Sequence, residues 1–107
     1  MPYLPINLQS PLGLTPPIAV GQATKLIAGI RIVSTATWST AVVGIEESVE
    51  VGSDYETWTE SSPTVRWSTG TKFRSNVGVG GKTWIRFRVI TAEAANDADA
   101  VVVYALR

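Results

Sequence analysis

Histidine and cysteine are both absent from this chain of 107 residues. Without them the chain cannot build a Ser/His/Asp triad, a cysteine nucleophile, a histidine-containing zinc site or a disulfide framework. An excess of charge is also missing, because nine Lys and Arg residues balance nine Asp and Glu residues. This balance provides no basic field for phosphate groups, so we expect no nucleic-acid partner.

Long apolar runs are missing as well. No stretch reaches 18 uninterrupted apolar residues, and the N-terminus lacks a charged segment followed by an apolar one. We therefore expect no membrane contact and a protein made in a cytoplasm, which the absence of cysteine fits. The length suits one compact domain, and 45% hydrophobic residues suffice for a core. A domain of this size has modest stability, which association into an oligomer would increase.

Residues 1–24 carry no charge, and five prolines punctuate them. Each proline restricts its own backbone and biases the preceding residue towards extended geometry, so we expect an extended, proline-rich N-terminal arm. The candidate contact residues of this arm are its large apolar side chains: Tyr3, Leu4, Ile6, Leu8, Leu12, Leu14, Ile18 and Val20.

Two interpretations of the arm stay open. It lies over its own domain as an edge strand or lid, or it lies on a neighbouring subunit or host surface, where a stiff segment loses less entropy on docking. The second interpretation predicts that deletion of residues 1–20 leaves a folded domain that no longer joins its assembly.

From residue 25 onward, apolar and polar residues alternate with the period of a β-strand. The alternation predicts strands at 25–34, 41–51, 56–60, 64–68, 71–79, 82–91 and 99–107. Residues 92–98 suit either a short helical turn or a loop. About seven short strands without a helical period indicate an all-β fold, an antiparallel β-sandwich or jelly-roll-like domain over residues 25–107.

The last two predicted strands are the clearest. In residues 82–91, Ile85, Phe87 and Val89 form an inward row opposite polar alternates. We expect this strand to pair with residues 99–107. That last segment is apolar on both faces, which predicts a strand that is central in the fold or covered by another subunit.

Carboxylates are the remaining candidates for acid–base chemistry. Glu46 and Glu47 are adjacent in a predicted strand and point to opposite faces, while Glu56 and Glu60 stand roughly 13 Å apart along another. The oxygen-rich stretch 96–99 lacks the glycine and distal glutamate of a calcium loop, so we expect a solvated turn. We predict that the chain is not an enzyme and has no catalytic residue, metal or cofactor.

Four tryptophans are many for this length. Exposed aromatic side chains stack on sugars or anchor protein interfaces, although core packing explains them equally well. Trp84 shares a strand face with two arginines, which favours a cation–π or stacking arrangement. The candidate surface platform comprises Tyr55, Trp58, Trp67, Trp84, Arg86 and Arg88.

Three segments have a layout found in known proteins: AVVGIEES at 41–48, GSDYETW at 52–58 and KTWIRFRV at 82–89. They lie within residues 41–90, a span of about half the chain. The layout resembles small β-sandwich structural proteins of tailed bacteriophages, above all capsid decoration (cement) proteins. It is also similar to galactose-binding-like carbohydrate modules, but such modules are usually longer, secreted and attached to an enzyme. The short chain without a secretion signal therefore favours the phage family.

The resemblance implies a non-enzymatic virion protein that binds the outside of a capsid through its arm and sheet edges. It implies a homotrimer whose partner is the major capsid protein or another virion protein. Exchanged arms would close naturally around a three-fold axis. The alternative is a glycan-binding or host-recognition module of a phage tail, with Tyr55, Trp58 or Trp67 in its platform. Whether the site of action is the capsid or the tail stays open.

Overall fold

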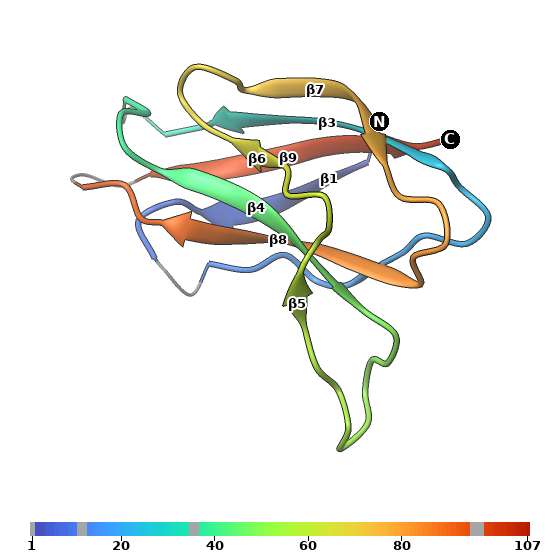
Figure 1. The fold of residues 1–107 in the computed structure, drawn as a ribbon. Helices are drawn as coiled ribbons and strands as arrows, with labels where there is room; N and C mark the ends of the chain where they lie inside the picture. Colours follow the sequence, from blue (N-terminus) through green and yellow to red (C-terminus); the bar gives the residue numbers. More distant parts are fainter. Residues whose placement is uncertain (1, 11–12, 35–36, 95–97) are drawn as a thin grey trace.

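The computed structural model describes residues 2–10, 13–34, 37–94 and 98–107, and the strands found there form two antiparallel sheets (Figure 1). Within these ranges no helix is present, and none could therefore span a membrane. The strands are β1 (Tyr3–Asn7), β2 (Ile18–Ala19), β3 (Lys25–Ile32), β4 (Val42–Ser48), β5 (Thr59–Glu60), β6 (Arg66–Trp67), β7 (Phe73–Gly78), β8 (Trp84–Thr91) and β9 (Asp99–Leu106). The predicted all-β class is confirmed.

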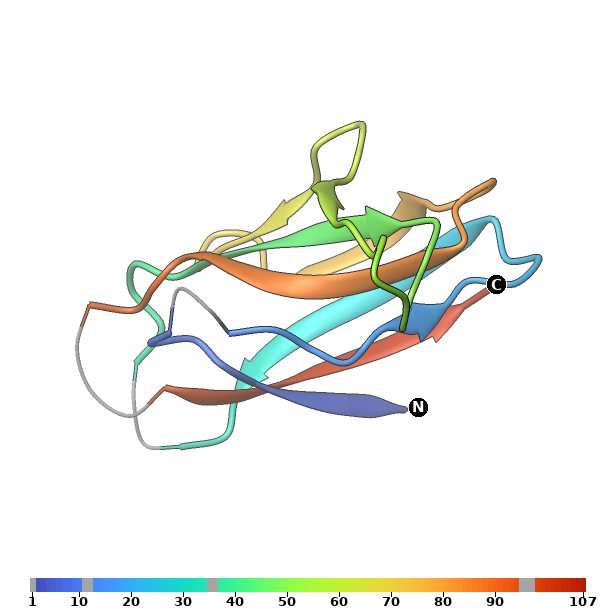
Figure 2. The same cartoon turned by 90° about the horizontal axis from the view of Figure 1, so that it is seen from below.

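The two sheets lie as separate layers with the core between them (Figure 2). The first sheet has the strand order β1-β9-β3-β7. The second has the order β2-β8-β4-β5, and β6 also pairs with β4. Most connections cross from one sheet to the other, so strands that follow each other in sequence often lie in different layers.

The predicted pairing of residues 82–91 with residues 99–107 is wrong. β8 pairs with β4 and β2 in the second sheet, whereas β9 pairs with β1 and β3 in the first. Both strands direct an apolar row into the same core, so they face each other across it instead of sharing backbone hydrogen bonds. The inward row Ile85, Phe87 and Val89 is confirmed, since all three are fully buried.

The segment between β8 and β9 is only partly described. Residues 92–94 form no helical turn. Asn96 and Asp97 lie outside the described residues, and with them most of the stretch weighed as a calcium loop.

The centre of the core joins the two sheets through aromatic side chains. The ring of Trp67 on β6 meets that of Phe87 on β8 edge-on, with centroids 5.3 Å apart. The Trp67 Nε1–H donates a 3.0 Å hydrogen bond to the carbonyl of Ala28 on β3, in the opposite sheet. Because this indole satisfies its polar group inside the core, Trp67 can be fully buried at no hydrogen-bonding loss.

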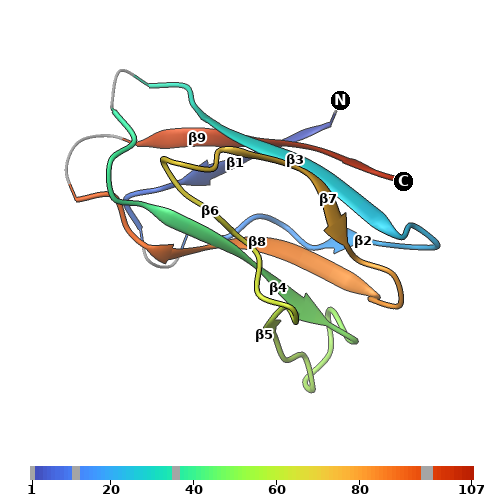
Figure 3. The same ribbon diagram turned by 45° about the horizontal axis from the view of Figure 1, so that its top comes forward.

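The N-terminal segment supplies one strand to each sheet, as Figure 3 shows for β1 and β2. β1 pairs with β9 over the whole register from Tyr3↔Val103 to Asn7↔Asp99, and β2 pairs with β8. Residues 3–7 therefore form an edge strand on their own domain, which was one of the two interpretations of the arm. Residue 24 is not a boundary between an arm and the sheets.

Four of the predicted arm contacts are core residues. Ile6, Leu8, Ile18 and Val20 are each at most 7% exposed. The expectation that they contact a neighbouring molecule is corrected, because their apolar area already leaves water inside this chain. Leu4 packs partly against the core, while Tyr3 and Leu14 stay exposed. Leu12 lies outside the described residues.

Candidate functional site

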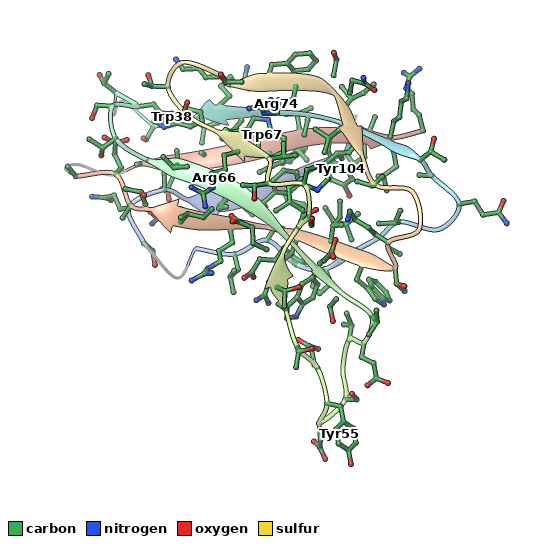
Figure 4. The ribbon with its side chains drawn as sticks, viewed as in Figure 1. Trp38, Tyr55, Arg66, Trp67, Arg74 and Tyr104 are labelled. Atoms are coloured by element: carbon green, nitrogen blue, oxygen red, sulfur yellow. The ribbon has the colours of Figure 1, made fainter. Side chains whose placement is uncertain are left out.

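The predicted aromatic platform does not form one surface. Trp67 is fully buried, so its assignment to a surface platform is wrong. Tyr55 lies at the tip of the long β4–β5 loop, 83% exposed and pointing away from the sheets (Figure 4). Alternation of residue types could not reveal that Trp67 is buried, since alternation does not distinguish a core tryptophan on a two-residue strand from an exposed tryptophan.

Trp58 and Arg86 form the cation–π contact on the second sheet. The guanidinium carbon of Arg86 lies 4.2 Å from the Trp58 ring centroid, so the partner is Trp58 and not the expected Trp84. Trp58 Nε1–H donates to Glu56 Oε2 at 2.9 Å, and Glu56 Oε1 accepts from the Gly52 N–H at 2.6 Å. The Gly52 bond, followed by the Trp58 bond, holds the pKa of Glu56 below its usual value. These contacts brace the base of the β4–β5 loop.

The two arginines of β8 are engaged by one carboxylate. Glu46 on β4 is 7% exposed and accepts from Arg86 Nε at 2.9 Å and from Arg88 Nη1 at 3.2 Å. Buried Glu46 is therefore the centre of a partly buried ion-pair network. Glu47 points to the other side, as predicted for adjacent strand residues, and pairs with Lys82.

A hollow of about 330 Å³ lies beside the β4–β5 loop. Its lining residues include Glu47 and Lys82, which form an ion pair, together with Thr57, Thr59 and Thr83. Such a wall offers hydrogen bonds to a polar ligand. In the described part of the chain no three potential metal ligands of the His, Cys, Asp or Glu type come together.

The outer face of the first sheet, directed away from the core, carries a set of apolar residues. By register it comprises Tyr3, Pro5, Ile27, Gly29, Phe73, Val101, Val103 and Ala105. One row crosses all four strands, because Tyr3 and Gly29 flank Val103 and Phe73 pairs with Gly29. Tyr3 is 67% exposed and Phe73 60%. The outer face of the second sheet, by contrast, carries the Glu46–Arg86–Arg88 network.

This outer face explains the apolar residues on both sides of β9. Its core side carries Ala100 and Val102, while Val101, Val103 and Ala105 are only half-buried on the other side. Nothing else in the described chain covers them fully. The alternation in 99–107 indicated this surface. Phe73 was missed, because only the pairing of β7 with β3 puts it there.

A buried carboxylate outside these surfaces has a structural role. Glu93 accepts hydrogen bonds from the Ser39 hydroxyl and from the backbone N–H groups of Ser39, Thr40 and Ala41. Burial by itself raises the pKa of Glu93, but these donors together outweigh it and lower the pKa to about 2. Glu93 thus ties the start of the β8–β9 connection to the residues that lead into β4.

No known protein family, curated protein or solved structure matches this chain in comparisons of sequence and fold.

Proposed function

We propose that this chain is a non-enzymatic structural protein that docks on another protein through the outer face of its first sheet. The exposed row Tyr3–Val103–Gly29–Phe73 carries this proposal. Contiguous exposed apolar surface is a feature of protein–protein contact sites, and aromatic side chains are enriched at such contacts. The charged outer face of the second sheet has its polar groups paired internally, which leaves the first sheet as the better docking surface.

The proposed setting is a virion. The resemblance of residues 41–89 to capsid decoration proteins supports this setting. A two-layer fold of this size supports it too, because a small β-sandwich or jelly roll is the fold that the resemblance implies. The partner would be the major capsid protein or another virion protein. Many symmetry-related copies would make a modest contact per copy sufficient for a stable shell. Three-fold association stays a prediction from the resemblance alone.

Co-sedimentation tests this proposal. Where a major capsid gene lies beside the gene of this chain, the probe is a shell assembled from that capsid protein. Wild-type protein is expected to sediment with the shell, and Val103→Asp is expected to stay in the supernatant while it keeps the wild-type circular dichroism spectrum. Val49→Asp is the matched control, because Val49 is 79% exposed on the β4–β5 loop, outside the outer face.

A second pair of variants protects the test against misfolding. Tyr3→Ser and Phe73→Ser remove exposed side chains and should fold normally while binding is weakened. Equal sedimentation of all outer-face variants and wild type would refute the docking role. If the gene lies among tail-fibre genes instead of portal and capsid genes, the capsid setting would be wrong.

The alternative function is glycan recognition at the hollow beside the β4–β5 loop. Its threonine hydroxyls and the Glu47–Lys82 pair match the hydrogen-bonding needs of a sugar, and Trp58 lies in the same loop. A glycan array with saturable binding, and a change in tryptophan fluorescence that Thr57→Val reduces, would favour this function. An array without any binding would remove it.

A further inference from the structure

The positively charged side chains of this protein divide into two groups. In the described ranges six of the nine have a side-chain partner: Arg66, Lys82, Arg86 and Arg88 pair with glutamates, Arg74 donates to a backbone carbonyl, and Lys72 lies over the Trp38 ring. The other three are Lys25, Arg31 and Arg107, and all three are exposed. Within the same ranges their side chains form no ion pair, hydrogen bond or ring contact. These three cations are therefore available to a binding partner.

All three available cations lie on the outer face of the first sheet. Lys25 and Arg31 alternate with the core residues Leu26 and Ile30 of β3, so their side chains point away from the core. Arg107 lies opposite Lys25, with which it exchanges backbone hydrogen bonds of 3.0 and 2.9 Å. Like charges directly opposite each other on a sheet repel, so this end of the face favours the approach of an anion.

Asp99 is the one anion at an outward strand position of this sheet, in the part of the chain that the structure describes. It lies diagonally from Arg31, which is opposite Val101, and forms no ion pair there. Three cations against one anion give the outer face a net charge of +2, although the whole chain is neutral. A second copy of the same face would bring positive charge against positive charge, so the face suits a different, acidic partner.

We infer that the partner of the outer face is a protein surface with carboxylates on both sides of an apolar centre. This inference rests on the docking role proposed above and adds the chemistry of the partner. Lys25 and Arg31 are six residues apart on β3, roughly 20 Å at the rise of a strand, with Ile27 and Gly29 at the outward positions between them. Carboxylates of the partner would neutralise the two cationic ends, while its apolar side chains cover the row through Val103. Nucleic acid fits less well, because its phosphates need a continuous basic track, which the apolar centre interrupts.

Two synthetic peptides of about ten residues test the sign of the partner's charge, since an extended segment of this length spans the face. Both peptides have the same apolar centre, which is flanked by glutamates in one and by lysines in the other. In an NMR titration of isotope-labelled protein, the glutamate peptide is expected to shift the amide signals of residues 25–31 and 99–107. It should bind at least roughly tenfold more tightly than the lysine peptide.

Charge variants of the protein check that the preference comes from this face. Lys25→Gln/Arg31→Gln should remove most of the preference for the glutamate peptide, whereas Asp99→Asn should increase it. Arg66→Gln and Asp54→Asn are the matched controls and should bind both peptides like wild type, because these exposed charges lie outside the face. Circular dichroism confirms that each variant is folded.

The outcomes separate this inference from the docking role on which it rests. Equal binding of both peptides to the outer face, or tighter binding of the lysine peptide, would overturn the acidic partner and leave the docking role standing. If neither peptide shifts these amides at millimolar concentration, the acidic partner is overturned as well, and the sedimentation of wild type and Val103→Asp with capsid shells decides the docking role by itself. A DNA oligonucleotide that binds the same face more tightly than the glutamate peptide would overturn the inference in favour of nucleic acid.

Discussion

Phe73 lies across Gly29 on the outer face of the first sheet, where a Cβ atom at Gly29 would come within 3.1 Å of Phe73 Cδ2. The glycine leaves room for the ring on a strand otherwise rich in branched residues. An aromatic ring that packs over a strand glycine covers the backbone that this glycine exposes. The pair therefore shapes the β7 side of the proposed docking surface.

Gly29→Val should displace the Phe73 ring without unfolding the domain. The clash falls on a side chain that is free to move into solvent, so we expect the free energy of unfolding to change by about 1 kcal/mol or less. The NMR shifts of the Phe73 ring and the binding to capsid shells should both change. Gly78→Val is the control on the same strand as Phe73, since an added Cβ there meets no atom within 4 Å. Unchanged ring shifts in Gly29→Val would contradict the described packing.

Deletion of residues 1–20 should unfold the domain, contrary to what a detached arm predicts. It removes Ile6, Leu8, Ile18 and Val20 from the core, and burial of such side chains stabilises by about 1.5–3 kcal/mol each. Their sum is comparable with the whole stability of a small domain, about 5–15 kcal/mol. Loss of the β-sheet circular dichroism spectrum checks this. A truncated protein with a cooperative unfolding transition would show that the segment is dispensable.

Trp67→Ala should cost about 3–5 kcal/mol of stability, because it opens a cavity beside Phe87 and leaves the Ala28 carbonyl without its Trp67 donor. Trp58→Ala should cost much less, since Trp58 lies at the surface on Arg86. Urea unfolding of the two variants measures the difference. Similar midpoints for both would mean that the two tryptophans are not packed as described.

Acid should weaken the fold through Glu93. Its pKa is about 2 in the folded chain and near 4.5 when unfolded, so the unfolded state takes up the proton first. The stabilisation by the carboxylate is complete above pH 4.5 and is lost as the pH falls towards 2. Glu93→Gln should lower the stability at neutral pH by about 1–3 kcal/mol and flatten this part of the pH profile. Asp54→Asn, on an exposed turn, should reproduce the wild-type profile.

Arg86→Ala should destabilise the fold more than Arg88→Ala. We expect a loss of about 1–3 kcal/mol for Arg86→Ala and of less than about 1 kcal/mol for Arg88→Ala. The Arg86 side chain is 19% exposed and that of Arg88 46%, although both contact Glu46. Arg86 also covers Trp58, so its loss removes two contacts. Thermal unfolding of the two variants at neutral pH makes the comparison. Equal losses would mean that Glu46 depends on both arginines alike.

The sequence by itself determined the strands. Alternation with period two predicted β3, β4, β8 and β9 and the inward row of β8, because side chains of a strand point alternately to its two faces whatever its neighbours are. The same rule indicated that β9 is apolar on both faces. One of these faces belongs to the apolar outer face of the first sheet. Proline and the absence of charge likewise predicted an extended segment before residue 25.

Only the tertiary structure decided which strands pair and which apolar residues are covered. Alternation is a local property, so it could not show that β8 and β9 face each other across the core, or that Ile6 and Leu8 fill that core. It could not separate buried Trp67 from exposed Tyr55 either. Glu93 and Phe73 were hidden for the same reason: the donors to Glu93 are more than 50 residues away in the chain, and the glycine under Phe73 lies on another strand. Such contacts exist only once distant segments are brought together by burial of a shared core.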